Sequence, residues 1–400
     1  MSLPRRLLDI VVITTLYPSE LRPHEGIFAE RRWIGMTQRG HRVRVLHPQP
    51  FAPPSFLPGI PEAWRESSRM AAQELRSGLL VSRPRYLHVP GRAVGNAGRL
   101  AKRCLASLPP SAKVDVCVLD YAWPAAACVA GLTSRGVPTV VSGRGSDILQ
   151  VAEIQDLRRE LQAALAQATS YCAVSHDLVG VMDELSGRAG AGRLVPNGVD
   201  TTGFLPAQRE PARASLGIAA EGPIVLVVGH LIERKDPILA LRAFASGAAA
   251  QARLYFVGRG PLQADLEREV HKLGLDGRVV LCGERPPEEL ARWYAAADLL
   301  LLTSTREGRP NVVLEALASG RPVLATPSGG TAELPLSEEM LCDSRDPQVL
   351  GRALELILAK NYEAEEIAAR AAPYSWEASR VALEELLLEA VDRGCDWPSA

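Results

Sequence analysis

Short apolar runs alternate with amphipathic helical segments along the whole chain. This alternation is typical of parallel β-sheets that are covered by helices on both faces. Twelve runs have the composition of buried strands: 10–14, 43–46, 114–119, 139–142, 171–174, 194–195, 224–228, 254–257, 279–281, 299–302, 323–325 and 340–342. The pattern therefore predicts an α/β protein with two doubly wound, Rossmann-like domains of about six strands each, which bind ligand at the carboxyl ends of their strands.

Turn residues mark the joint between the two halves. The segment 196–200 (Pro-Asn-Gly-Val-Asp) gives way to a polar stretch, and a new apolar strand begins at Ile224. We place the N-terminal domain at 1–203 and the C-terminal domain at 204–373. Residues 374–391 have an amphipathic pattern after Pro373, so we expect a C-terminal helix within 374–400 that packs back toward the first domain.

Composition describes an ordinary globular protein. The 400 residues are 47% hydrophobic and 23% charged, and the formal net charge of -1 argues against attraction of the whole protein to nucleic acid. The seven cysteines include no Cys-x-x-Cys pair, which favours reduced thiols and a cytoplasmic location. Asp9 interrupts the apolar run after Arg5 and Arg6, so this run is interpreted as a first strand rather than a signal peptide.

Two glutamates eight positions apart stand at a junction between a predicted strand and a helix. Glu307 lies in the loop after the leucine run 299–302, whereas Glu315 lies about 6 Å further along the helix at a rise of ~1.5 Å per residue. Pro310 suits the first turn of that helix, and Gly320 ends it. Read alone, the pair is also typical of a solvent-exposed loop and helix face.

The start of this helix offers an anion-binding site between the two carboxylates. Backbone amides in the first turn lack partners within the helix and point toward its positive end. A diphosphate bound there would place a sugar near Glu307 and a ribose near Glu315, whose carboxylates accept hydrogen bonds from paired hydroxyls. The amides concerned belong to Asn311, Val312 and Val313.

Three glycine turns follow other strands of the second half. Gly229 and His230 come directly after the strand 224–228, and the basic pair Arg234 and Lys235 follows them. Small residues let the backbone approach a phosphate, and cations neutralise it. The other two turns are Gly258-Arg259-Gly260-Pro261 and 328–333. Because the carboxyl ends of parallel strands share one edge of a sheet, these turns are expected to converge.

Two loops of the first half have similar chemistry. Gly26 precedes a helix after the first strand, and Arg144 stands between two glycines after the strand 139–142, with Asp147 close behind. Arg144 is interpreted either as a surface arginine or as a cation that faces a cleft between the domains. Asn197, in the turn segment, completes this set of N-domain cleft candidates.

Two further segments of the first half stand out by composition. Residues 48–61 hold six prolines, which predicts a loop. Residues 75–114 hold eight Lys and Arg side chains and no Asp or Glu. This basic stretch is either a solvated face or a patch for anionic lipid headgroups or a phosphate-bearing acceptor, which would make the protein peripheral to the inner face of a membrane.

Together these motifs resemble those of the retaining glycosyltransferases of family 4, which have the GT-B fold of two Rossmann-like domains facing an interdomain cleft. The likeness covers almost the whole chain and rests on the paired glutamates, Lys235, the segment 196–200, the glycine turns and the tail around Trp376. The segments at 17–18, 26–28 and 144–147 resemble more narrowly the members that build cell-surface polysaccharides of the teichuronic acid type.

The resemblance implies a role for each of these residues. Glu307 would contact the donor sugar and be central to catalysis, Glu315 would hold the ribose, and Lys235 with an arginine would stabilise the departing diphosphate. Two positions depart from the family. His230 replaces the usual arginine, which leaves Arg234 as its substitute, and Arg144 stands where many members have histidine, so a catalytic histidine cannot be assigned.

The expected activity is transfer of a hexose-type sugar from a nucleoside diphosphate sugar to a hydroxyl of a glycan or lipid-linked acceptor, with retention at the anomeric carbon. No Asp-x-Asp clamp stands out, so neither a metal nor a cofactor besides the donor is expected. The alternatives are an epimerase or phosphorylase on the same fold, and a noncatalytic subunit that binds nucleotide sugars. The sequence identifies neither the base, the sugar nor the acceptor.

Overall fold

The chain forms two compact units in the computed structural model, which describes residues 6–51, 62–108, 114–218 and 221–395. The first unit contains the residues up to Pro196 and those from Ser379 onward, and the second contains Asn197–Ala378. The chain passes from the first unit to the second after Pro196, which is earlier than the predicted domain boundary at residue 203. Val199 and Phe204 are already buried in the core of the second unit.

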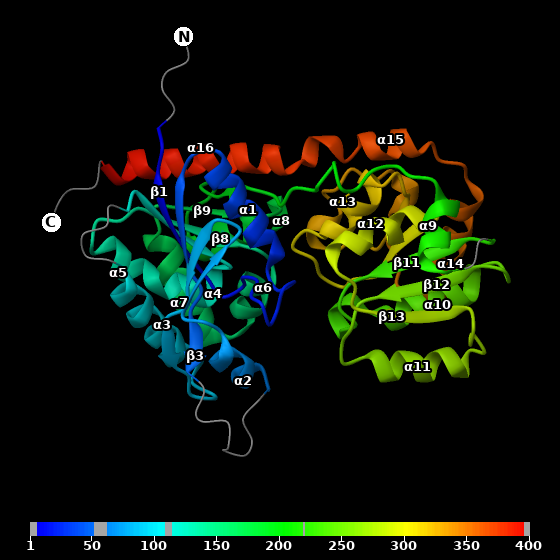
Figure 1. The fold of residues 1–400 in the computed structure, drawn as a ribbon, viewed down its shortest axis with the longest axis horizontal. Coiled ribbons are helices and arrows are strands. Elements are labelled where there is room, and N and C mark those ends of the chain that lie inside the picture. The colour runs from blue at the N-terminus through cyan, green and yellow to red at the C-terminus, as the bar shows by residue number, and fades with distance from the viewer. Residues whose placement is uncertain (1–5, 52–61, 109–113, 219–220, 396–400) are drawn as a thin grey trace, which may run out of the picture. The chain divides into compact units, whose positions relative to one another are not determined.

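The first unit is built on an eight-stranded sheet with the order β10-β9-β8-β7-β1-β2-β5-β4, in which only β4 is antiparallel (Figure 1). A separate parallel pair, β3 and β6, lies beside it. The strands are β1 Asp9–Thr14, β2 Arg42–Leu46, β3 Gln49–Phe51, β4 Gln73–Arg76, β5 Leu79–Ser82, β6 Arg85–Leu87, β7 Val116–Asp120, β8 Thr139–Gly143, β9 Ser170–Ala173 and β10 Arg193–Leu194.

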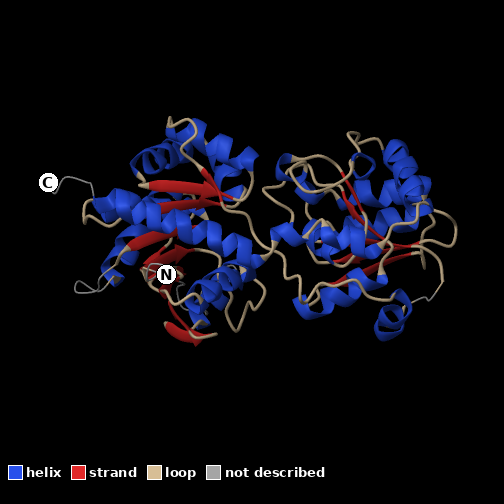
Figure 2. Ribbon diagram, turned by 90° about the horizontal axis from the view of Figure 1, so that it is seen from above, coloured by secondary structure: helices blue, strands red, loops and turns tan. Residues whose placement is uncertain are grey.

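Helices cover both faces of this sheet, as Figure 2 shows from above. One core lies under α3, α5, α7 and α8, and the other lies under α1 and the C-terminal helix α16. The helices are α1 Ile27–Gln38, α2 Glu62–Arg69, α3 Ala93–Ser107, α4 Ala122–Ala125, the 3-10 turn η1 Ala126–Cys128, α5 Val129–Thr133, α6 Ser146–Glu153, α7 Gln155–Gln167, α8 His176–Ser186 and α16 Trp376–Cys395.

The second unit is a five-stranded parallel sheet with the order β13-β12-β11-β14-β15. Its strands are β11 Ile224–Val228, β12 Arg253–Val257, β13 Val279–Gly283, β14 Leu299–Leu302 and β15 Val323–Ala325. Its helices are α9 Arg209–Leu216, α10 Pro237–Gly247, α11 Gln263–Lys272, α12 Pro287–Ala296, α13 Asn311–Ala318, α14 Pro347–Ala359 and α15 Ala364–Ala369, with 3-10 turns η2 Glu233–Lys235, η3 Gly329–Thr331, η4 Glu338–Met340 and η5 Ala372–Tyr374.

One strand prediction and one loop prediction need correction. The run 340–342 is not a strand: it contributes the end of η4 and one isolated bridge between Leu341 and Ala325. The segment 48–61 is not wholly a loop, because Gln49–Phe51 forms β3 and pairs with β6, while 52–61 lie outside the described residues. The hairpin of β4 and β5 was not predicted: β4 is mostly polar, and the three apolar residues of β5 were not recognised as a strand.

No helix within the described ranges is both long enough and apolar enough to cross a bilayer.

Candidate functional site

The second unit has a topological switch point at β11. From β11 the chain continues to β12 and β13 on one side, and then returns to place β14 and β15 on the other side. The loops after β11 and β14 therefore leave adjacent strands in opposite directions. This is where open parallel sheets bind their ligands, at the carboxyl ends of the strands.

Glu307 meets two cations at this point. Its Oε2 lies 3.3 Å from Nη1 of Arg234, and its Oε1 contacts Nζ of Lys235. The glutamate is only 5% exposed, so its charge is held in place by these partners rather than by water. The structure thus brings together three residues that the sequence analysis assigned to catalysis.

Backbone hydrogen bonds bring a third loop to Glu307. Thr305 N donates to Arg234 O at 2.8 Å, which joins the loops after β11 and β14. Gly330 N donates to Glu307 O at 3.2 Å, which joins the turn after β15 to the same residue. The expected convergence of loops at one sheet edge is therefore present for the loops that follow β11, β14 and β15.

Asp236 fixes the end of the basic pair. Its backbone is left-handed, with φ of 44°, and its side chain caps α10 by accepting a hydrogen bond from Leu239 N at 3.1 Å. The same carboxylate lies 2.5 Å from Nη2 of Arg345. Lys235 thereby ends the 3-10 turn η2 at a defined position before the helix begins.

The two glycine turns of this unit lie against each other. Gly229 N donates to Val257 O at 3.0 Å, and Leu231 N donates to Arg259 O at 3.0 Å. A Cβ on Gly258 would lie 1.9 Å from Gly229 O, and a Cβ on Gly260 would lie 2.3 Å from Leu231 O. Only glycine fits at these positions. His230, between the turns, is exposed.

The helix after Glu307 begins one residue later than expected. Pro310 is the N-cap residue, in an extended conformation, and α13 starts at Asn311. Val313 N donates to Pro310 O at 3.2 Å, so its amide is already used in the first turn. Asn197 is grouped with the second unit rather than the first, and its amide donates to Asn311 Oδ1 at 3.4 Å.

Glu315 lies on α13 beside a buried tyrosine. The Tyr294 hydroxyl donates to Glu315 Oε2 at 2.9 Å. Burial, followed by the charge of Glu315, raises the pKa of Tyr294 well above its ordinary value, so the phenol stays protonated and acts as a donor to the carboxylate. The sequence analysis missed Tyr294, because a tyrosine in an amphipathic helix has the pattern of a core residue.

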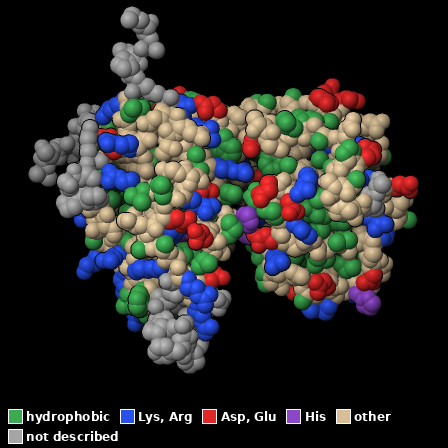
Figure 3. Space-filling view, viewed as in Figure 1, with side chains coloured by type: hydrophobic (Ala, Val, Ile, Leu, Met, Phe, Trp, Pro, Cys, Tyr) green, Lys and Arg blue, Asp and Glu red, His purple; other side chains and the backbone are tan. Residues whose placement is uncertain are grey.

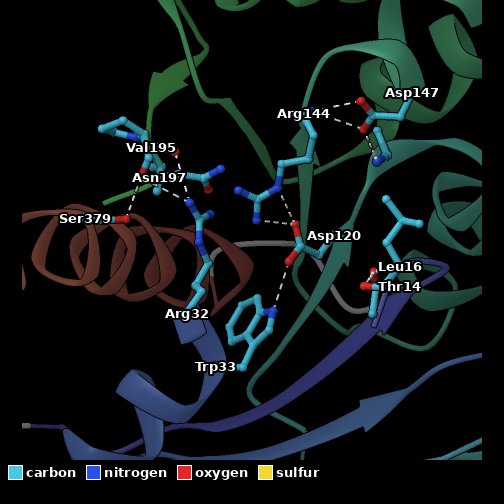
Figure 4. A network of polar contacts seen from close by, with 12 residues as sticks. Thr14, Leu16, Arg32, Trp33, Asp120, Arg144, Asp147, Val195, Asn197 and Ser379 are labelled. Atoms are coloured by element: carbon cyan, nitrogen blue, oxygen red, sulfur yellow. Dashed lines mark hydrogen bonds and ion pairs between the residues drawn. The ribbon is translucent and has the colours of Figure 1, made fainter. Parts of the chain in front are cut away.

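In the first unit, Arg144 is a buried member of an ion pair rather than a surface arginine (Figure 4). Its Nε and Nη2 lie 2.9 and 2.5 Å from Asp120 Oδ1, and Trp33 Nε1 donates to Asp120 Oδ2 at 2.9 Å. The guanidinium carbon also stands 5.1 Å from the centre of the Phe28 ring. Arg144 is therefore held on several sides at the carboxyl end of β8.

Charges around Asp120 determine its protonation. Burial acts to raise the pKa of this carboxyl, but the cations of Arg144 and Arg32 prevail and lower it. Burial, together with the charge of Arg144, lowers the pKa of Arg32 to about 9. Arg32 also donates to Val195 O at 3.3 Å and to Pro196 O at 3.2 Å (Figure 4). Sequence reasoning missed Asp120, although a carboxylate that ends a buried strand is a recognisable signal.

Asp147 organises the loop that carries Arg144. Its carboxylate accepts hydrogen bonds from the amides of Arg144, Gly145 and Ala122, at 2.9, 2.8 and 2.6 Å. Burial nevertheless raises the pKa of Asp147 to about 6. The first loop is equally constrained, because a Cβ on Gly26 would lie 2.6 Å from the Leu16 carbonyl carbon.

The basic stretch 75–114 is partly internal. Arg76 pairs with Glu30 at 2.6 Å, Arg83 pairs with Glu74 at 2.6 Å, and Arg85 donates to the carbonyl oxygens of Ser67 and Met70. The remaining described cations are on or beside α3, where Figure 3 shows several Lys and Arg side chains. They are Arg92, Arg99, Lys102 and Arg103.

The sequence is similar to known glycosyltransferases. Residues 208–374 match the family model "Glycosyl transferases group 1". A Bacillus subtilis (strain 168) protein, TuaC, named as a teichuronic acid biosynthesis glycosyltransferase, is 28% identical over 370 residues, or 90% of each chain. The D-inositol 3-phosphate glycosyltransferase of Nocardia farcinica is 39% identical over 147 residues, which are 34% of this chain and 32% of that protein.

Solved structures resemble the fold over nearly its full length. Sucrose-phosphate synthase from Thermosynechococcus elongatus has a TM-score of 0.77 at 21% identity, with 94% of this chain and 98% of that chain covered. The Anabaena protein HepE, in complex with UDP and glucose, has a TM-score of 0.73 at 18% identity, with 95% and 99% covered. These likenesses confirm the predicted α/β fold of the GT-B type.

Proposed function

Residues 208–374 form a group 1 glycosyltransferase domain, and from this premise we propose that the protein is a retaining glycosyltransferase. It moves a hexose-type sugar from a nucleoside diphosphate sugar to a hydroxyl group of a glycan or lipid-linked acceptor in polysaccharide biosynthesis. The bond from the anomeric carbon to the diphosphate breaks with its electron pair on the diphosphate, the acceptor oxygen bonds to that carbon on the same face, and the acceptor's hydroxyl proton passes to the departing diphosphate. The similarity to a protein named for teichuronic acid biosynthesis supports this acceptor class.

One observation carries the proposal: Glu307 with Lys235 and Arg234 at the switch point of the second unit. The two cations and the first amides of α13 stabilise the negative charge that develops on the departing diphosphate. Glu307 contacts the donor sugar, and Glu315 accepts hydrogen bonds from the ribose hydroxyls. The turns at Gly229, Gly258 and Gly260 let the backbone approach the nucleotide closely.

Neither a metal nor a cofactor is required in this mechanism. Lys235, Arg234 and the start of α13 supply positive charge to the diphosphate, which is the task that a divalent cation performs in other phosphate-transferring sites. Transfer is therefore expected to continue in EDTA.

The first unit receives the acceptor in this proposal. Gly26, Arg144 and Asp147 belong to loops at the carboxyl edge of its sheet, where a rigid cation suits a polar or anionic acceptor. Apolar residues are also exposed in the strand pair that contacts α3: Phe51 and Leu87 are 54% and 58% exposed and are paired between β3 and β6.

We propose that α3 and this strand pair rest on the cytoplasmic surface of the membrane. Sedimentation with vesicles tests this part. The protein should pellet with vesicles that contain phosphatidylglycerol but not with pure phosphatidylcholine, and Lys102→Glu with Arg103→Glu should weaken pelleting. Equal pelleting of both proteins would contradict it.

Thermal unfolding in the presence of nucleotides tests donor binding. Each of UDP, ADP and GDP, and their glucose or mannose derivatives, is added at a concentration far above its expected Kd. A ligand at about 100 times its Kd adds about 2.7 kcal/mol to the stability of the folded state, which raises Tm by several degrees. If none of these ligands raises Tm, the proposed function is wrong.

A further inference from the structure

Tyr294 links the two helices that flank β14 in sequence. It lies near the end of α12, before the strand, and Glu315 lies on α13, after it. Its hydroxyl oxygen is 2.9 Å from Glu315 Oε2. The side chain is fully buried, whereas Glu315 is half-buried, so the hydrogen bond runs from the core outward to a carboxylate that solvent reaches.

Packing fixes the ring of Tyr294. The Phe204 ring meets it edge to face, with the ring centres 5.7 Å apart. Both rings belong to the buried core of the second unit, which also contains Val313 and Leu317 of α13. A side chain held in this way has few conformations available, so its hydroxyl points at Glu315 without a further loss of conformational freedom.

This hydrogen bond helps to orient the carboxylate. An ionised carboxylate has about four acceptor sites, and the donor from the core occupies one of them on the buried side. The Tyr294 hydroxyl keeps its proton throughout the physiological pH range, because burial and the charge of Glu315 raise the pKa of the phenol. The arrangement is suited to a carboxylate that must present a constant geometry to a ligand.

We propose that Tyr294 is a positioning residue for donor binding: it holds Glu315 in the orientation that accepts hydrogen bonds from the vicinal 2′ and 3′ hydroxyls of a ribonucleotide. The inference rests on the proposed function, which places the ribose at Glu315. If Tyr294 has this role, the preference of the protein for ribonucleotides over nucleotides without these hydroxyls depends on a buried tyrosine.

The alternative is that the hydrogen bond to Glu315 only provides a partner for the buried Tyr294 hydroxyl and has no role in ligand binding. Removal of that hydroxyl would then affect stability, and it would affect the binding of every nucleotide to the same extent. If Tyr294 acts through Glu315, removal of its hydroxyl affects only ligands that carry the ribose hydroxyls. The two views differ in the coupling between the protein hydroxyl and the ligand hydroxyls.

Calorimetric titration measures this coupling on the full-length protein. Wild type and Tyr294→Phe are each titrated with UDP, ADP and GDP and with the 2′,3′-dideoxy analogue of each. For the ribonucleotide that binds most tightly, Tyr294→Phe should weaken binding about tenfold, as expected for a hydrogen bond to a charged group. For its dideoxy analogue, the two proteins should bind within about a factor of two of each other.

Tyr362→Phe serves as the matched control, since it removes a phenol from the same unit at a residue that is not part of the proposed site. It should leave both affinities unchanged. Glu315→Gln provides a second route if Tyr294→Phe folds poorly: it should lose affinity for the ribonucleotide only, and adding Tyr294→Phe to it should produce little further loss.

Two results would overturn the inference while leaving the proposed function intact. One is an unchanged affinity of Tyr294→Phe for the ribonucleotide, and the other is an equal loss for the ribonucleotide and its dideoxy analogue. If wild type binds none of the three diphosphates, the proposed function itself is wrong, and the inference falls with it.

Discussion

A buried carboxylate sets the position of the cations at each of the two candidate sites. In the second unit Glu307 lies between Arg234 and Lys235, and in the first unit Asp120 is held by Arg144 and Trp33. Charges removed from water are costly unless they are paired and hydrogen-bonded, so each carboxylate and its partners form a single unit of structure. Substitution of one of these residues is therefore expected to change the position of its partners.

Loss of the Asp120 charge should destabilise the first unit. Asp120→Asn leaves the guanidiniums of Arg144 and Arg32 buried near an amide, and breaking a buried pair in this way costs about 3–5 kcal/mol. Urea unfolding of the purified protein measures the change in free energy. Asp156→Asn, at an exposed position of α7, is the control and should differ from wild type by less than about 0.5 kcal/mol. Equal stability of the two variants would contradict the account.

Asp147 should make stability depend on pH. Its pKa is raised from 3.8 to about 6, so the folded protein holds this proton more tightly than the unfolded chain does. The stabilising contribution is then complete below about pH 4 and is lost as the pH rises through about 6. The unfolding free energy of wild type, relative to Asp147→Asn, should fall over this range in urea titrations. A relative stability that increases with pH would show that the sign is wrong.

At the scale of elements, glycine turns bring the loops of the second unit together. The turns after β11 and β12 are hydrogen-bonded to each other, and Gly258 lies against the backbone of Gly229. The sequence pattern of a strand followed by glycine predicts each turn separately. It does not show that residue 258 must be glycine because the backbone of Gly229 lies against it.

Gly258→Ala should damage this unit severely. The residue has φ of 147°, and the added Cβ would stand 1.9 Å from a carbonyl oxygen, so strain and steric overlap combine to cost about 3 kcal/mol or more. Gly274→Ala separates the two effects, because Gly274 has φ of 66° but no atom within 4 Å of its Cβ position; its cost should be about 1 kcal/mol. Thermal and urea unfolding measure both. Similar losses in the two variants would rule out the steric explanation.

Periodicity predicted the strands that are buried on both faces, with three partly exposed ones, and missed the short strands β3 to β6. The runs at 224–228, 299–302 and 323–325 are strands with the predicted bounds, because a parallel strand between two helical layers must be apolar throughout. The strands β4 and β5 form a hairpin at the sheet edge, where burial alternates and Leu75 and Leu80 are exposed, and the mostly polar β4 has no apolar run. The run 340–342 is apolar because it packs beside β15, not because it extends the sheet.

The candidate site divides in a similar way. Glu307, Arg234 and Lys235 were predicted because each belongs to a recognisable motif, the paired glutamates or the basic pair after a glycine turn. Tyr294 and Asp120 belong to no such motif, and their roles arise from side-chain contacts that the pattern of apolar and polar residues does not record.

At the scale of the whole molecule, the chain crosses from the first unit to the second near Pro196 and returns near Ser379. The last helix then completes the core of the first unit, where Leu383, Leu386 and Leu387 pack with residues of β1 and β2. The first unit is therefore assembled from both ends of the chain and is not expected to be stable without its final segment.

Leu387→Ala should destabilise the first unit, although the residue is close to the end of the chain. Leu387 is fully buried, and such a truncation costs about 2–5 kcal/mol. Hydrogen exchange should accelerate in peptides from β1 and β2 but not in those from β11 and β12. Val381→Ala, on an exposed face of the same helix, should leave exchange unchanged. Faster exchange confined to α16 would contradict this view of the core.

The most direct test of the account is release of nucleoside diphosphate from a sugar nucleotide by wild type and by Glu307→Gln, in EDTA and with the donor that stabilises the protein most. Glutamine keeps the shape of the side chain but removes the charge that holds Lys235 and Arg234. Wild type should release the diphosphate, and the variant should lose about 100-fold or more of this turnover while it still binds the donor. Equal turnover by the two proteins would contradict the central role of Glu307.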